Sequence, residues 1–72
     1  MTGGDAFGHE EHPWIGRAVE DIPSKGQGRL MAVVREKVRN YEGQERWVRL
    51  AYIRPDSGIE WSTAVANISL LP

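Results

Sequence analysis

The side chains best suited to chemistry in this chain are cationic and aromatic, and they suit binding rather than catalysis. Arg46, Trp47 and Arg49 stand almost side by side, with Tyr41 before them and Arg54 after them. Guanidinium groups bind phosphates and carboxylates, and flat aromatic faces stack on bases or on apolar peptide side chains. These five residues are the hypothetical contact residues of a binding site.

The chain offers little for acid–base or nucleophilic catalysis. Both of its histidines lie near the N-terminus, in His9-Glu10-Glu11-His12, so no serine in the rest of the chain has a histidine that would activate it. We therefore expect no enzymatic activity.

Metal and phosphate sites are weakly supported as well. His9 and His12 are three residues apart, which suits a divalent cation on a helix, but zinc proteases use a spacing of four and no third ligand follows. Gly26 and Gly28, with Lys25 before them, suggest a phosphate cradle. A Walker loop, however, places its lysine after the glycines and at the start of a helix. We expect turn geometry here, and neither a metal nor another cofactor.

A β-hairpin must position the candidate contact residues. Residues 46–54 fall into two interleaved sets, which a strand directs to opposite faces. We expect Val48, Leu50 and Tyr52 to share the buried face. The other set lies on a partly covered face and comprises Trp47, Arg49, Ala51 and Ile53. Pro55-Asp56-Ser57-Gly58 predicts a turn, after which Trp61 is expected in the core. The sequence favours neither exposure nor burial of the Trp47 side chain.

The rest of the chain predicts short strands with tight connections. Residues 1–13 carry glycine and charge without periodicity, so we expect a disordered acidic tail before a domain of residues 14–72. Residues 29–39 fit either a long bent strand or a short helix, and the three valines and the preceding glycine loop favour the strand. A single helical turn is expected at residues 64–67. The expected strands are residues 14–22, 30–38, 45–54, 59–63 and 68–71.

Composition limits the class of protein further. The 72 residues make one domain and include no cysteine, which excludes disulfides and suits a reducing cytoplasm. No apolar run is long enough for a membrane helix, and the N-terminus does not read as a signal peptide. The net charge is −1, but the first thirteen residues hold three acids and no Lys or Arg, so the remainder carries +2. That excess permits a polyanionic partner without requiring one.

Five strands and one helical turn before the last strand predict a small, strongly bent antiparallel barrel, because closure hides strand edges. Gly16-Arg17-Ala18-Val19-Glu20-Asp21, then Gly26-Gln27-Gly28 and the apolar residues 29–34, resemble the KOW-type SH3-like barrel. With Gly58-Ile59-Glu60-Trp61, the layout is similar to a group of short actinobacterial proteins that carry G-x-x-V-x-D, L-R-P and G-x-E-W elements. The chain departs from that pattern in its longer, charged residues 35–46.

The resemblance implies binding, since KOW-type barrels contact RNA or proteins and SH3-like barrels bind extended segments in aromatic-lined grooves. Glu42 and Glu45 lie near the candidate aromatics, and the net charge is small, so we expect a protein or peptide partner. The alternative is an RNA- or DNA-binding module in which arginines meet phosphates. Arginines clustered around Trp47, with acids elsewhere, would reverse this preference. We expect a monomeric, cytoplasmic binding or regulatory module.

Overall fold

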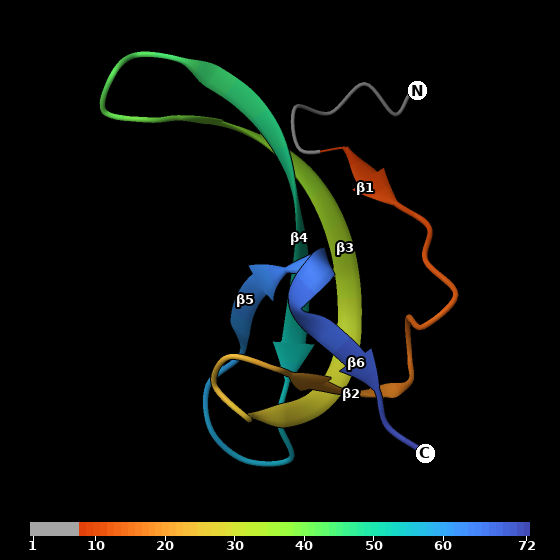
Figure 1. Ribbon diagram of the computed structural model, residues 1–72. Coiled ribbons are helices and arrows are strands. Elements are labelled where there is room, and N and C mark those ends of the chain that lie inside the picture. The colour runs from red at the N-terminus through yellow and green to blue at the C-terminus, as the bar shows by residue number, and fades with distance from the viewer. Residues whose placement is uncertain (1–7) are drawn as a thin grey trace.

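The chain forms an antiparallel β-sheet. In the computed structural model, which describes residues 8–72, there are six strands and one short 3₁₀ turn (Figure 1). The strands are β1 (His9–Glu10), β2 (Ala18–Asp21), β3 (Gln27–Arg39), β4 (Glu45–Arg54), β5 (Trp61–Ala64) and β6 (Ile68–Leu70). The 3₁₀ turn, η1 (Val65–Asn67), stands between β5 and β6, where a helical turn was expected. The all-β, antiparallel prediction is confirmed.

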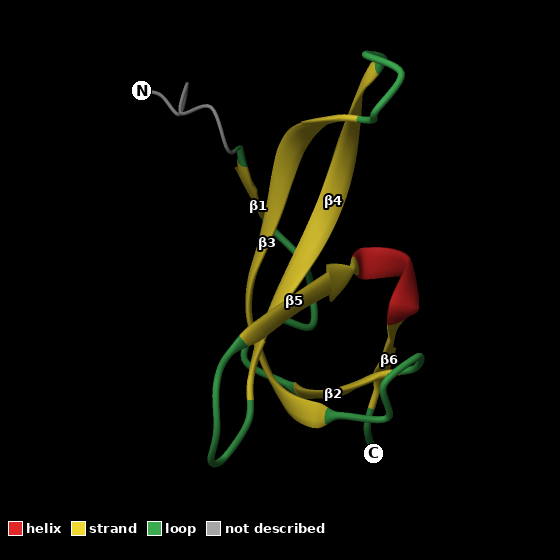
Figure 2. Ribbon diagram, turned by 90° about the vertical axis from the view of Figure 1, so that its left-hand side faces the viewer, coloured by secondary structure: helices red, strands yellow, loops and turns green. Residues whose placement is uncertain are grey.

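The sheet does not close into the five-stranded barrel that we expected. Its strand order is β5-β4-β3-β2-β6, and β1 joins β3 off this path. In the described part of the chain, the outermost strands β5 and β6 share no ladder of hydrogen bonds, although the sheet curls strongly (Figure 2). η1 follows β5 directly and carries the chain from β5 to β6 at the other end of the strand order, without a ladder between these two strands.

A buried carboxylate bridges the open side of the sheet instead. Asp21, at the end of β2, is 5 % exposed and accepts hydrogen bonds from Ser24 Oγ at 2.7 Å and Thr63 Oγ1 at 3.0 Å. The indole of Trp61 provides a third donor. These bonds hold the pKa of Asp21 below its ordinary value, foremost through Ser24 and against the opposing effect of burial. Asp21 therefore joins β2 to β5, which are not neighbours in the sheet.

The long β3–β4 hairpin dominates the molecule. It pairs residues from Arg29 opposite Arg54 to Arg39 opposite Glu45, so residues 29–39 form the bent strand and not the helix. A bulge between Leu30 and Ala32 shifts the register. Beyond the other strands, residues 35–49 project as a two-stranded ribbon, which we call the arm (Figures 1 and 2). Asn40 closes its turn by accepting the N–H groups of Glu42 and Gln44, each at 3.0 Å.

The core lies on the concave face of the curled sheet. It is formed by six apolar residues: Val19, Leu30, Val33, Ala51, Ile53 and Ile68. Val34 is also buried, but on the convex side. Trp61 packs against this cluster, as expected. The buried face of β4 is the opposite of our prediction, because Ala51 and Ile53 are fully buried whereas Leu50 and Tyr52 are only half-buried. The sheet curls toward Ala51 and Ile53, so β2 and β6 cover that side.

The expected disordered tail and first strand are also corrected. β1 pairs His9 with Val34 and Glu10 with Val33, so ordered structure begins before Pro13. His12 Nδ1 accepts the Trp14 N–H at 3.1 Å. The chain then turns, with a bond of 2.8 Å from Arg17 N to Trp14 O, and the strand predicted for residues 14–22 begins only at Ala18. The part of the predicted tail in residues 1–7 lies outside the described residues.

Candidate functional site

The structure does not gather the five hypothetical contact residues into one site. Tyr41 lies at the tip of the arm with 98 % of its surface exposed. Trp47 and Arg49 share the concave side of β4, whereas Arg46 and Arg54 lie on the convex side because strand side chains alternate. Arg54 is seven positions along the strand from Trp47, which at the usual rise is roughly 23 Å. Only Trp47 and Arg49 are neighbours on one face.

Trp47 is half-exposed, at 50 %, but its ring already has cationic neighbours. Lys37 lies directly opposite it on β3, and the Lys37 ammonium is 5.5 Å from the ring centroid. The guanidinium of Arg35 is 4.9 Å from the same centroid. These are cation–π distances. The arm's own basic residues therefore occupy the surface that would stack on a base.

Acidic side chains accompany the basic ones along this face of the arm. Glu10 of β1 binds Arg49 Nε at 2.7 Å and lies 4.0 Å from Arg35. Glu45 binds Arg39 and lies 3.5 Å from Lys37. The hydrogen bond from Arg39, followed by the charge of Lys37, holds the pKa of Glu45 below its ordinary value. The arm is thus a ladder of mixed charge rather than a basic surface.

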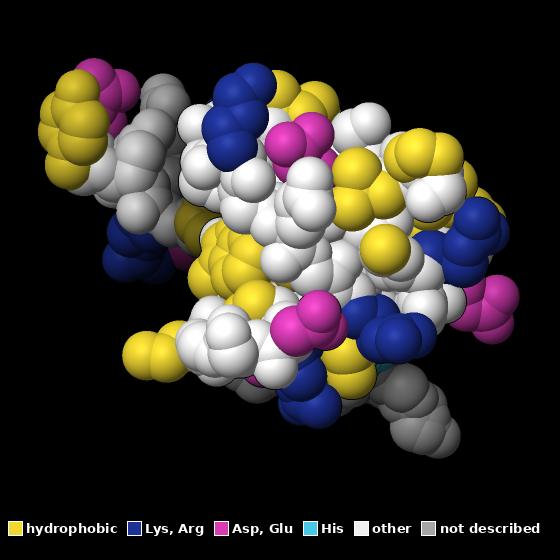
Figure 3. Space-filling view, turned by 90° about the horizontal axis from the view of Figure 1, so that it is seen from below, with side chains coloured by type: hydrophobic (Ala, Val, Ile, Leu, Met, Phe, Trp, Pro, Cys, Tyr) yellow, Lys and Arg dark blue, Asp and Glu magenta, His cyan; other side chains and the backbone are white. Residues whose placement is uncertain are grey.

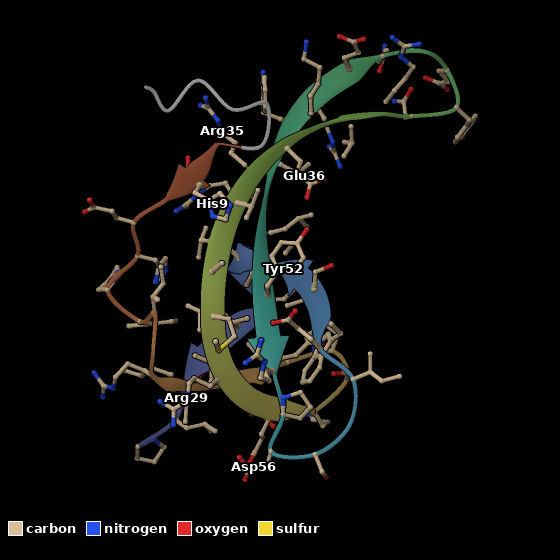
Figure 4. The ribbon with its side chains drawn as sticks, turned by 180° about the vertical axis from the view of Figure 1, so that it is seen from behind. His9, Arg29, Arg35, Glu36, Tyr52 and Asp56 are labelled. Atoms are coloured by element: carbon tan, nitrogen blue, oxygen red, sulfur yellow. The ribbon has the colours of Figure 1, made fainter. Side chains whose placement is uncertain are left out.

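The convex face of β3 and β4 carries a different feature, a hollow of about 370 Å³ that we call the convex trough. Figure 4 looks onto this face from behind and shows Glu36 and Tyr52 pointing toward one another from the two strands. The floor is apolar and consists of Met31, Ala32 and Val34. Its polar border consists of His9, Glu36, Tyr52 and Glu60. An apolar floor with a few polar groups is the usual form of a binding site.

The border of the convex trough is acidic. The Tyr52 hydroxyl donates a hydrogen bond of 2.8 Å to Glu36 Oε2. That bond, then burial, then the charges of Glu36 and Glu60 raise the pKa of Tyr52 above its ordinary value. Glu60 forms an ion pair with Arg54, whose Nε lies 3.9 Å from Glu60 Oε2. The arrangement suits a ligand that combines an apolar group with a positive charge.

Sequence reasoning missed this trough because it placed Tyr52 in the core. A usable signal was present in residues 34–38, where Glu36 interrupts an otherwise apolar set of alternate positions, Val34 and Val38. An acid inside such a set marks a face that is not fully covered. This signal can be used only if residues 34–38 form a strand, because alternate positions do not share a face in a helix, which the same residues also fitted.

Gly26 lies in the loop that we expected, whereas Gly28 belongs to β3, and both serve packing. A Cβ atom on Gly28 would lie 2.6 Å from the Arg54 carbonyl oxygen, and one on Gly26 would lie 3.0 Å from the Trp61 ring. The contact at Gly28 leaves no room for a side chain, and the one at Gly26 would require the Trp61 ring to shift by a few tenths of an ångström. Between residues 8 and 72, no three His, Cys, Asp or Glu side chains are grouped as a metal site would need. That same part of the chain contains no helix with the length and apolarity needed to cross a membrane.

Comparison with known proteins adds no relative. No protein-family model, curated protein or solved structure matches the chain.

Proposed function

We propose that this protein is a non-enzymatic, cytoplasmic binding module that holds an extended segment of a protein partner in the convex trough. The segment would place an apolar side chain on Met31, Ala32 and Val34. A lysine or arginine beside it would meet Glu36 or Glu60. The single observation that carries this proposal is the apolar floor bordered by carboxylates.

The chemistry of the trough supports a cationic peptide over other ligands. Glu36 is half-buried between β3 and β4, and its hydrogen bond from Tyr52 uses only one of its two oxygens. The second oxygen has acceptor capacity for an ammonium or guanidinium group. A charge-assisted bond of this kind fixes the register of a segment whose apolar contacts lack direction.

The distribution of charge favours a protein over a nucleic acid. Glu10 and Glu45 pair with the basic residues around Trp47, so the acids do not lie elsewhere. The end of the molecule seen from below likewise shows Lys and Arg interspersed with acidic and apolar side chains (Figure 3). Affinity for a nucleic acid comes largely from basic side chains that neutralise phosphates and release counterions, and on the arm carboxylates already pair with those side chains.

The proposed relationship to SH3-like barrels has two supports. Strands β2 to β6 provide the five strands that the resemblance implies, and η1 stands before the last of them. The convex trough contains an aromatic residue beside acids, as expected of a groove for extended segments. Strand β1 and the long arm are additions to that pattern.

An amide NMR titration tests the proposed function. We would add a short peptide of alternating leucine and arginine, and a matched peptide with glutamate in place of arginine. The expected result is a set of shifts at Met31, Glu36, Tyr52 and Glu60 with the basic peptide alone. Glu36→Gln should weaken these shifts, whereas Glu42→Gln, at the exposed tip of the arm, should not.

Two other results would count against the trough. If the basic peptide leaves all four amides unchanged, the proposed site is wrong. If mixed single-stranded RNA or DNA shifts Arg46, Trp47 and Arg49, and the shifts fade as salt is added, the module binds nucleic acid through its arm instead.

A further inference from the structure

One edge of the arm has no strand beside it. β5 pairs with β4 from Leu50 to Ile53, and the ladder ends where Ala64 meets Leu50. From Glu45 to Arg49, β4 therefore has β3 on one side and no strand of the described residues on the other. Figure 2 shows this edge free along the projecting arm. An edge of this kind presents backbone groups to which another strand can pair.

The backbone groups that face this edge can be identified. The Arg35 N–H donates to Gly8 O at 3.0 Å, so it points away from β4. Opposite residues of an antiparallel pair point their backbone groups the same way, either both inward or both outward, and this alternates along the ladder. Arg49, opposite Arg35, thus directs its N–H and C=O groups outward, as do Trp47 and Glu45 at every second position.

The charges along this edge are self-complementary when two copies of the edge run antiparallel. If two copies pair antiparallel with Trp47 opposite Trp47, then Glu45 of each copy lies opposite Arg49 of the other. Arg46 lies opposite Val48. All three outward-facing residues then exchange backbone hydrogen bonds, and both cross-strand charge pairs have opposite sign, which stabilises such pairs. We propose that the protein forms a twofold symmetric dimer through the β4 edges of the arm, in place of the monomer expected from its sequence.

Features next to the edge support a second copy as the occupant. Pairing must stop at Glu45, where the turn begins, and at Arg49, because Ala64 occupies the next position. Trp47 is the middle of the stretch that remains. A hollow runs between this edge and η1, lined by residues 46–49 of β4 and by the apolar residues Ala64, Val65 and Ala66. The twofold arrangement directs the tip of the other arm, with its fully exposed Tyr41, toward this apolar surface.

The charged residues along the edge are able to interact with a second copy. Among the described residues, no ion pair is recorded for Arg46, although its neighbours on the arm have carboxylate partners. The Glu45 side chain is 41 % exposed and that of Arg49 is 50 % exposed, so each can meet a further charge without leaving its present partner. A closed, isologous contact satisfies both edges at once and leaves none for further growth.

Single cysteines test the predicted symmetry directly, because the chain has none of its own. In Trp47→Cys, the two new thiols face each other across the twofold axis. Hydrogen-bonded antiparallel pairs have Cα atoms about 5.5 Å apart, within the range of a disulfide. Under mild oxidation, Trp47→Cys should form a covalent dimer roughly tenfold faster than Val48→Cys, whose counterpart in the other copy is Arg46. Equal rates for the two variants would overturn the proposed register.

Charge reversal supplies an independent test. Sedimentation of the wild-type chain over a concentration series should show a monomer–dimer equilibrium. Glu45→Arg and Arg49→Glu should each weaken it by roughly tenfold or more, since like charges then oppose, and an equimolar mixture of the two should restore it. Asp56→Arg and Arg17→Glu make the same charge changes away from the edge and should have no effect. A wild-type chain that stays monomeric at every concentration, or single variants that dimerise normally, would overturn the proposal.

Discussion

The indole Nε1 of Trp61 in β5 donates a hydrogen bond of 3.2 Å to Oδ2 of Asp21 in β2. Two strands, β4 and β3, separate β5 from β2 in the sheet, so this bond spans the concave side rather than joining neighbours. Thr63 reinforces it from the same strand, and Asn67 Nδ2 in turn donates to Thr63 Oγ1 at 3.2 Å. One carboxylate and its neutral donors thus link β2 to β5 across the concave side of the open sheet.

Replacing this carboxylate should destabilise the domain. In Asp21→Asn, an amide NH₂ group would face hydroxyl and indole donors, and at least one buried polar group would lose its partner. We expect the free energy of unfolding to fall by about 1–3 kcal/mol. Urea denaturation measures the change. Glu20→Gln, the same chemical change on the less buried neighbour, should cost far less, and equal losses in the two variants would contradict the role assigned to Asp21.

The same carboxylate predicts how stability depends on pH. Donors from Ser24, Thr63 and Trp61 lower the pKa of Asp21 in the folded protein. An acid with a depressed folded pKa stabilises the fold fully above its unfolded pKa, about 3.9, and loses this contribution as the pH falls through the folded value. Wild-type stability should therefore drop below about pH 4 more steeply than that of Asp21→Asn. Parallel curves from thermal melts across this range would exclude Asp21 as the cause.

Tyr52 should titrate at a higher pH than an ordinary phenol. Its proton is held by the hydrogen bond to Glu36, by burial and by nearby negative charge, all of which raise its pKa. Because the raised value belongs to the folded state, the stabilisation is complete below the ordinary value near 10 and is lost as the pH rises through the folded one. Ultraviolet titration in a Tyr41→Phe background isolates Tyr52. Glu36→Gln should lower the measured pKa, and an unchanged value would mean that this hydrogen bond does not form.

Trp61 and Trp47 should respond differently to replacement by alanine. Trp61 is partly buried, packs on the core and binds Asp21, so Trp61→Ala should cost about 3 kcal/mol, the lower end of the range for a buried Trp. Trp47 is half-exposed and contributes mainly cation–π contacts, so Trp47→Ala should cost no more than about 1 kcal/mol. Denaturation at low protein concentration keeps association from adding to the result. Unfolding of Trp47→Ala would place Trp47 in the core and remove it from any surface role.

A methyl group at Gly28 should be costly. The Cβ atom would meet the Arg54 backbone at 2.6–2.8 Å and the Ile53 side chain at 2.8 Å, so β3 and β4 would have to separate. Overpacking of this kind costs about 1–3 kcal/mol. Chemical denaturation of Gly28→Ala, with the exposed neighbour Gln27→Ala as its control, measures the effect. A tolerated Gly28→Ala would mean that the two strands lie farther apart.

Most of the strands could be predicted from alternation and turn residues. The β4 strand and the helical turn before β6 both lie where the pattern placed them. The buried face of β4 could not be found, because alternation defines two sets without saying which one the sheet curls toward. The bulge at Met31 adds to this, since it changes which positions of β3 face the core. β1 has two residues and exists only through its pairing with β3, so no local pattern reveals it.

The candidate site was predicted less well than the strands. Trp47 and Arg49 do lie together, but Arg35 and Lys37, which cover the Trp47 ring, come from the other strand of the arm. Their approach depends on the register of β3 against β4, and register follows from the length of the turn. The convex trough likewise combines residues from both strands with His9 and Glu60, which lie far away in sequence.

The position of β2 has a consequence for synthesis on the ribosome. β2 can pair with β3 once both strands have been made, but its other edge pairs with β6, where Val19 meets Leu70 and Asp21 meets Ile68. Until residues 61–70 have been made, the edge of β2 is unpaired and the donors Trp61 and Thr63 are missing. The ladders of β3 with β1, β2 and β4 can form early, whereas β5, β6 and the bonds to Asp21 can be added only after nearly every residue has been translated.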